Sequence, residues 1–224
     1  MSGFKLVVFD YDGTLFDTRP AIHHCIQHAF AACGRPIPTL EAIAGTVRTG
    51  LPLQETFFGL DKNLRAERAA LNEIVGTYRK LYLDEGTLMS KPFAGVSDAL
   101  RDIHASGSKC VVVSNKGIAA IRYSLDQSRL SSFVDFVFGD EPGLPKKPDP
   151  GILLDHILPG YAQLPREQTL VVGDTEIDIL LAKRTGIPCC WASYGYGEAD
   201  RCRALKPEHE IAGIEELPAL VHCR

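Results

Sequence analysis

The residues best suited to chemistry in this sequence lie in four short polar clusters that follow apolar runs. The clusters occupy residues 10–14, 114–117, 146–150 and 173–178. Any one of them is compatible with an ordinary polar loop. If the apolar runs are parallel strands of one sheet, however, the clusters meet at the carboxyl edge, where open α/β sheets bind ligands. The spacing therefore predicts a single site built from all four clusters.

Besides Asp149, the clusters contain four aspartates, namely Asp10, Asp12, Asp174 and Asp178. Crowded carboxylates repel one another, and a hard cation offsets this repulsion; oxygen ligands favour Mg²⁺. The clusters contain no His or Cys, so a zinc site is not expected. A carboxylate can also attack a phosphate ester and form an aspartyl-phosphate, while a second carboxylate serves first as acid and then as base.

Acid–base help alone cannot account for hydrolysis of a phosphate ester. It contributes about 10²–10⁴-fold, whereas the slowest such reactions require up to about 10²¹-fold acceleration. Positioning and charge stabilisation must supply most of the difference. A lysine, a serine hydroxyl, backbone N–H groups and a metal around the phosphoryl oxygens would do so, and the clusters supply the lysine, the hydroxyl and the metal ligands.

The elements that must position these clusters follow an alternating pattern. Short apolar runs predict buried strands over residues 4–9, 109–113, 133–138, 169–172 and 187–191. Helical patterns separate most of these runs, which predicts a parallel sheet covered on both faces. Residues 16–90 are far more than one crossover needs. With helical patterns at 20–33 and 61–85, this stretch predicts an inserted helical module, with hinges near 15–18 and 90–92.

Composition and charge exclude several classes of partner. The 224 residues carry a net charge of −4 and no long basic run, which argues against a nucleic-acid partner. The seven cysteines form no C-x-x-C pair, so we expect reduced thiols and a cytoplasmic location. No signal peptide or apolar run of transmembrane length is visible, so no membrane partner is expected. The predicted site needs only one chain, so a monomer is the default expectation.

Four runs of sequence, in order, carry a resemblance to a known family. VVFDYDGTLFDT, VVVSNKG, KKPDP and VVGDTEIDI resemble the four successive motifs of the haloacid dehalogenase-like phosphatases. The resemblance spans nearly the whole chain. It implies a Rossmann-like α/β fold, with a doubly wound parallel sheet as the core and a small inserted all-helical cap. The core would comprise residues 1–15 and 91–224, and the cap residues 16–90.

The resemblance also implies catalytic roles for individual residues. Asp10 would be the nucleophile, and Asp12 the general acid and base. Ser114 and Lys147 would bind the phosphoryl group, with help from the backbone of Asn115. Lys147 would thus belong to the catalytic group.

The same resemblance implies a Mg²⁺ site. The metal would contact a carboxylate oxygen of Asp10, the backbone carbonyl of Asp12 and a carboxylate of Asp174. Asp178 would contact it directly or through water. The neighbouring Lys146 leaves open which of two adjacent lysines points into the site.

Further details resemble the phosphoglycolate phosphatase-like branch of the family. They are the pair Asn115-Lys116 after Ser114, the loop at residues 193–197 and the stretch at residues 45–53. That last stretch resembles the substrate-specificity loop of the branch's cap, and Arg48 within it is a candidate to meet a substrate carboxylate or phosphate. The branch implies a small phosphate monoester as substrate. We expect the two tyrosines of the 193–197 loop to pack rather than to bind ligand.

Several other functions remain open on the same scaffold. The four motifs do not separate a monoester phosphatase from a pyrophosphatase or nucleotidase. Sugar phosphomutases similar to this family carry a cap histidine where this chain has Ile22, with His23 beside it. A dehalogenase would lack Asp12, and a binding module without activity would lack Asp10, so both aspartates argue against these alternatives.

Overall fold

The centre of the molecule is a parallel β-sheet. The computed structural model describes residues 3–222, and within them the six-stranded sheet has the order β5-β4-β1-β6-β7-β8. Every neighbouring pair is parallel. The strands are β1 (Leu6–Phe9), β4 (Lys109–Gly117), β5 (Phe136–Asp140), β6 (Thr169–Gly173), β7 (Cys189–Ala192) and β8 (His209–Ile211). The predicted doubly wound α/β fold is confirmed.

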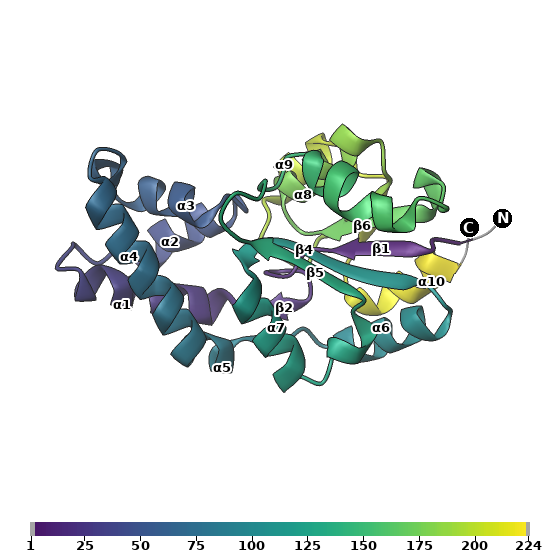
Figure 1. Ribbon diagram of the computed structural model, residues 1–224, viewed down its shortest axis with the longest axis horizontal. Helices are drawn as coiled ribbons and strands as arrows, with labels where there is room; N and C mark the ends of the chain where they lie inside the picture. The colour runs from purple at the N-terminus through teal and green to yellow at the C-terminus, as the bar shows by residue number, and fades with distance from the viewer. Residues whose placement is uncertain (1–2, 223–224) are drawn as a thin grey trace.

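Helices cover both faces of this sheet (Figure 1). The side chains of β1 alternate between two apolar cores, with Val7 and Phe9 in one and Leu6 and Val8 in the other. The first core includes side chains of α6 (Val96–Ala105), α7 (Ile118–Gln127) and α10 (Leu217–His222). The second includes α8 (Glu176–Thr185), α9 (Ala199–Ala204) and the irregular helical segments Ile152–Ile157 and Leu158–Tyr161. Burial on both faces explains why the central strands read as continuous apolar runs.

A helical unit lies between two very short strands, β2 (Phe16–Asp17) and β3 (Lys91–Pro92), which pair antiparallel. Its helices are α1 (Arg19–Ala32), α2 (Leu40–Val47), α3 (Leu53–Leu60), α4 (Arg68–Leu81) and α5 (Thr87–Met89). They enclose an apolar core of their own that includes Phe30, Phe57 and Tyr78. Figure 1 shows the unit at one end of the sheet, opposite the chain termini.

The structure differs from the sequence predictions in several elements. The single helix predicted over residues 61–85 is wrong: a 3-10 turn at Lys62–Arg65 precedes α4, and a wider π-turn at Tyr82–Gly86 separates α4 from α5. A Cβ on Gly86 would lie 3.0 Å from the sulfur of Cys25 in α1, so the chain passes very close to α1 at this turn. Helices α2 and α3 and the edge strand β8 were not predicted individually.

No helix within residues 3–222 combines the length and the apolar character needed to cross a membrane.

Candidate active site

The chemistry-bearing residues lie at the carboxyl ends of the three central strands. Asp10 follows β1, Ser114 lies within the last residues of β4, and Asp174 follows β6. From β1 the strand order runs outward to β4 and β5 on one side and to β6, β7 and β8 on the other. Such a reversal point is where open α/β sheets bind their ligands. The backbone N–H of Asp10 donates to the carbonyl of Val172 at 2.8 Å, which fixes the two loops side by side.

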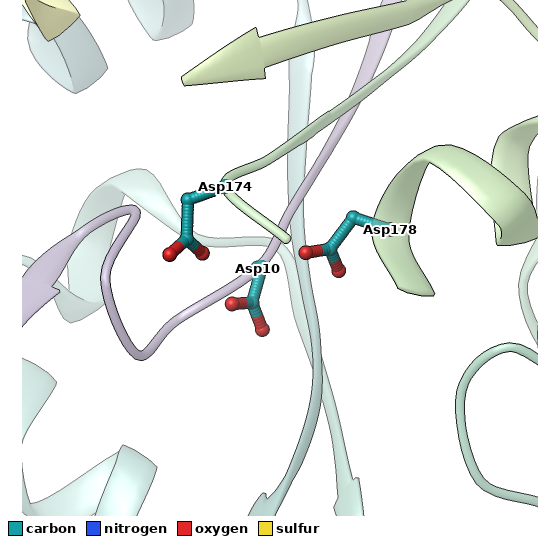
Figure 2. A group of neighbouring side chains, drawn as sticks. All are labelled: Asp10, Asp174 and Asp178. Atoms are coloured by element: carbon teal, nitrogen blue, oxygen red, sulfur yellow. The ribbon is translucent and has the colours of Figure 1, made fainter. Parts of the chain in front are cut away.

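Three buried carboxylates gather at this point. One oxygen from each of Asp10, Asp174 and Asp178 lies within 4.8 Å of the other two, and Figure 2 shows the three carboxyl groups turned toward a common space. An all-oxygen donor set of this kind suits a hard divalent cation. The donor chemistry therefore fits the Mg²⁺ site that the sequence predicted.

Asp174 is the most enclosed of the three. Its Oδ1 accepts a hydrogen bond from the hydroxyl of Thr14 at 3.0 Å, and its Oδ2 accepts one from the backbone N–H of Tyr196 at 2.7 Å. Burial raises the pKa of Asp174 well above its usual range, and the charges of Asp10 and Asp178 add to this effect. A bound cation would lower the pKa of Asp174 and hold its carboxylate in the charged form.

Asp178 serves the fold as well as the site. Its Oδ2 accepts from the backbone N–H of Thr175 at 3.0 Å and from the Thr175 hydroxyl at 2.7 Å, which closes a capping box at the start of α8. Its Oδ1 accepts from the ammonium of Lys147 at 2.7 Å. Helix capping and a contribution to the acidic cluster are thus compatible in one residue.

Lys147 supplies the positive charge within this cluster. Its Nζ lies 2.5 Å from Asp10 Oδ1, and the side chain is almost fully buried. Burial alone would lower the pKa of Lys147, but the attraction of Asp10 and Asp178 outweighs it and raises that pKa. Burial raises the pKa of Asp10 to about 7 despite the opposing effect of Lys147.

The neighbouring Lys146 points away and binds the carboxylate of Asp140. Lys147 is therefore the lysine that enters the site. The ammonium of Lys147 offsets the charge of only one of the three buried carboxylates, so a divalent cation would balance the other two.

Ser114 and Asn115 border the same space. Ser114 is buried, and its Oγ accepts from the backbone N–H of Lys116 at 3.3 Å. The Asn115 side chain accepts from the Lys147 N–H at 2.8 Å and donates to the Lys147 carbonyl at 3.2 Å. Its amide also reaches the helical unit, where it donates to the carbonyl of Gly50 at 3.2 Å. Sequence reasoning gave Asn115 only a backbone role, whereas its side chain clamps the loop that carries Lys147.

Asp12 stands apart from the three clustered carboxylates. Its Oδ1 accepts from Lys116 Nζ at 3.0 Å, and it faces a cavity of about 330 Å³ between the sheet edge and the helical unit. The sheet side of this cavity also presents Asp10, Ser114, Asn115 and Lys147. Much of the rest is apolar and comes from the helical unit, including Ile22, Ile26, Val47, Leu53 and Tyr82.

Arg48 is the one predicted site residue that the structure does not bring to the others. It ends α2, its side chain is exposed, and it does not line the cavity. The neighbouring Gly50 approaches the sheet edge instead. The prediction of Arg48 relied on the resemblance of residues 45–53 to a substrate-specificity loop, which does not reveal which side chains of the loop turn inward.

The loop at residues 193–197 contributes more than packing. The hydroxyl of Tyr194 donates to the carbonyl of Thr14 at 2.7 Å. The hydroxyl of Tyr196 donates to Asp17 at 2.9 Å and accepts from the Thr18 N–H at 2.6 Å. Both tyrosines therefore hold the segment that follows Asp10. The sequence marked this loop only by its resemblance to the family branch.

Close contact between this loop and the acidic cluster requires glycine. A Cβ on Gly195 would lie 2.2 Å from the Cβ of Asp174, and one on Gly197 would lie 2.1 Å from its carbonyl oxygen. No real side chain tolerates such distances.

Gly50 offers a direct test of the contact between the helical unit and the sheet. Its φ is +63°, and an added Cβ would lie 2.6 Å from Thr175 Oγ1 and 2.9 Å from the Ile177 side chain. A left-handed conformation costs an L-residue about 1–2 kcal/mol. We expect Gly50→Ala to lower kcat/KM by about 5- to 30-fold, because the loop no longer seats against the core.

Gly45→Ala is the matched control for that test. Gly45 lies within α2, and nothing comes within 4 Å of a Cβ added there. The same substitution in this open helical position should leave kcat/KM unchanged, since alanine favours helix. Equal kinetics for the two variants would mean that seating of Gly50 is unimportant.

Comparison with known proteins places this geometry in a family. The model of the haloacid dehalogenase-like hydrolases matches residues 7–192. A phosphoglycolate phosphatase from Pseudomonas syringae pv. tomato is 30% identical over 97% of this chain and 78% of its own length. Another, from Thiobacillus denitrificans, is 28% identical over 97% of this chain and 95% of its own length.

Solved structures share the fold. A haloacid dehalogenase-like family hydrolase from Streptococcus pneumoniae is 27% identical, with a TM-score of 0.81 over 96% of this chain and 97% of its own. A structure described as a predicted phosphoglycolate phosphatase from Haemophilus somnus is 22% identical, with a TM-score of 0.84 over 98% of this chain and 99% of its own. The family model and the two named relatives confirm the family indicated by the four motifs and the branch indicated by residues 45–53, 115–116 and 193–197, and with them the prediction of a phosphatase enzyme. The chain belongs to the haloacid dehalogenase-like hydrolase family, in its phosphoglycolate phosphatase-like branch.

Proposed function

We propose that this protein is a Mg²⁺-dependent phosphatase that hydrolyses a small phosphate monoester through an aspartyl-phosphate on Asp10. The observation that carries the proposal is the juxtaposition of Asp10 with Lys147 and with the carboxylates of Asp174 and Asp178. Asp12 faces the adjoining cavity, where the leaving group would lie. In these positions Asp10 can act as the nucleophile with the Lys147 ammonium beside it, and Asp12 can donate a proton on the side of the leaving group.

In the first half of the reaction, a carboxylate oxygen of Asp10 attacks phosphorus, and the bond from phosphorus to the ester oxygen breaks. The protonated carboxyl of Asp12 gives its proton to that oxygen, which departs as an alcohol. In the second half, water attacks phosphorus. Asp12 takes the proton from water, the bond to Asp10 breaks, and phosphate leaves with Asp10 regenerated.

The remaining residues would bind the phosphoryl group and keep it in line. Lys147 would pair with one phosphoryl oxygen, and the hydroxyl of Ser114 and nearby backbone N–H groups would bind others. Asp10, Asp174 and the backbone of Asp12, with Asp178 directly or through water, would hold Mg²⁺. When bound, the metal would neutralise charge on the phosphoryl oxygens and between the crowded carboxylates.

Phosphoglycolate or a similar small ester is the substrate we propose. The names of the relatives from Pseudomonas syringae pv. tomato and Thiobacillus denitrificans support this choice. We further propose that residues 16–90 act as a cap that opens on hinges near 15–18 and 90–92 and excludes water when closed. The pairing of β2 with β3 at these two crossings supports the location of the hinges.

A sugar phosphomutase and a pyrophosphatase or nucleotidase are the alternatives on this scaffold. The mutase has less support because Ile22 lines the cavity, whereas the neighbouring His23 does not. The described cysteines are free thiols, which supports the proposed cytoplasmic location. A monomer with a small-molecule partner stays the default prediction.

The experiment that tests the function is phosphate release from a panel of esters, with and without Mg²⁺. The panel contains phosphoglycolate, sugar phosphates, nucleotides, pyrophosphate and an aryl phosphate. We expect Mg²⁺-dependent release that is greatest for a small monoester. Absence of release from every member would refute the phosphatase, and interconversion of a sugar phosphate would favour the mutase.

Metal binding has a readout that does not depend on activity. Mg²⁺ at about one hundred times its Kd should stabilise the fold by about 2.7 kcal/mol, because it binds the native acidic cluster and not the unfolded chain. The melting temperature should rise when Mg²⁺ is added, and a chelator should abolish that rise. Asp174→Asn should abolish the Mg²⁺-dependent shift, whereas Asp102→Asn, on the exposed surface of α6, should keep it. A full shift in Asp174→Asn would refute the assigned metal ligands.

A further inference from the structure

Lys116 is a buried cation for which the proposed reaction steps provide no role. It lies on β4, two residues beyond Ser114, and its side chain is 8% exposed. We propose that Lys116 recognises an anionic group, such as a carboxylate, on the leaving portion of the phosphate ester. This inference rests on the proposed function and deepens it by naming the residue that selects the substrate.

The contacts of Lys116 leave part of its ammonium available. Its Nζ donates to Asp12 Oδ1 at 3.0 Å and lies 3.6 Å from the centroid of the Tyr82 ring. An ammonium has three N–H donors, and Asp12 accepts the one hydrogen bond that this Nζ makes within residues 3–222. The ring of Tyr82 holds the cation in place through a cation–π contact without using a hydrogen-bond acceptor. Lys116 lines the cavity, so a bound ligand can reach its remaining donors.

The position of Lys116 fits a carboxylate close to the scissile bond. To protonate the leaving oxygen, Asp12 must lie within about 2.6–3.2 Å of it. Lys116 binds the same carboxyl group of Asp12, so its ammonium lies beside the place where the leaving oxygen departs. In phosphoglycolate, a single methylene separates that oxygen from the carboxylate. A carboxylate at that separation can therefore contact Lys116 while the ester oxygen contacts Asp12.

The other cations at the cavity are engaged elsewhere. Among residues 3–222 they are Lys147, bound to Asp10 and Asp178, and Arg79, which pairs with Asp140 at 2.7 Å. The side chain of Arg79 is 48% exposed, and Arg48 does not line the cavity.

Apolar side chains cover much of the remaining wall, including Ile22, Ile26 and Val47. An anionic leaving group placed against them would lack a partner, and burial of an unpaired charge is costly. Lys116 is therefore the residue best placed to accept such a group.

The test compares two esters that share the CH₂–O–phosphoryl unit, phosphoglycolate and ethyl phosphate, which differ in a carboxylate against a methyl group. The quantity measured is the ratio of their kcat/KM values in the unaltered protein with Mg²⁺ and in Lys116→Met. A hydrogen bond to a charged group contributes enough to predict a fall in the ratio of about 10- to 100-fold. Lys116→Arg retains the positive charge and should keep most of the preference. Arg79→Gln, which removes the other nearby cation, should leave the ratio unchanged.

The outcomes separate this proposal from the function on which it rests. If Lys116→Met lowers kcat/KM equally for both esters, Lys116 only positions Asp12, and the proposal is wrong while the phosphatase stands. A loss of preference in Arg79→Gln instead of Lys116→Met would also overturn the assignment, as would an unaltered protein that favours ethyl phosphate. If the unaltered protein hydrolyses neither ester nor any other phosphate monoester, the phosphatase itself is refuted.

Discussion

Replacement of Asp10 by asparagine should reduce the rate of phosphate release by at least about 10⁴-fold, because an amide cannot act as the nucleophile. The variant should remain folded, since asparagine has nearly the same shape and removes one charge from the three crowded carboxylates. Steady-state phosphate release measures the effect on turnover, and the melting temperature checks the fold.

A rapid acid quench makes the test of Asp10 specific to the covalent step. The ester is labelled in its phosphoryl group, and acid is added during turnover. The denatured unaltered protein should then carry the label covalently, whereas Asp10→Asn should carry none. Asp102→Asn, an exposed change of the same type on α6, should match the unaltered protein in both assays. A folded Asp10→Asn variant with turnover within tenfold of normal would exclude Asp10 as the nucleophile.

Lys147→Met should damage both activity and stability. The ammonium lies 2.5 Å from Asp10 and 2.7 Å from Asp178, and all three side chains are buried. Loss of one partner from a buried ion pair costs about 3–5 kcal/mol, because the remaining charge is left uncompensated. Loss of a group that stabilises transition-state charge should lower kcat by about 10²–10³-fold. Urea unfolding without metal measures the first effect, and phosphate release with Mg²⁺ measures the second.

The adjacent lysine is the control for Lys147. Lys146 pairs with Asp140 nearer the surface, so Lys146→Met should change the free energy of unfolding by less than about 1 kcal/mol. Mg²⁺ should restore part of the stability of Lys147→Met, since it supplies positive charge to the same carboxylates, but it should not restore turnover. If the two lysine variants lose equal stability, the buried cluster does not depend on Lys147.

The sequence predicted the sheet and its acidic cluster because both have strong local signals. The strands at the centre of the sheet are buried on both faces, so they appear as unbroken apolar runs. The polar clusters follow them directly, and the rule that parallel strands end at one edge then brings Asp10, Asp174 and Asp178 together. Neither step required knowledge of distant contacts.

The rest of the site depends on contacts between distant segments. The turn at Tyr82–Gly86 is fixed by close approach to α1, and this places the Tyr82 ring against Lys116 from β4. Tyr196 reaches the start of α1 from the other end of the chain. The spacing of residues along the sequence does not predict these contacts. For the same reason, the sequence does not reveal that Lys116 lines the cavity and that Arg48 does not.

The apolar core of the helical unit is almost entirely its own, since Ala120 of α7 is the sole contributor from the sheet side in the described cluster. A substitution among its buried residues therefore changes the wall of the cavity without disturbing the packing that holds β1 and Asp10. Substitutions that reshape the apolar wall of the cavity and substitutions that alter the acidic cluster thus fall in separate parts of the chain. The helical unit can therefore change the shape of the cavity while Asp10 and its neighbours on the sheet keep their packing.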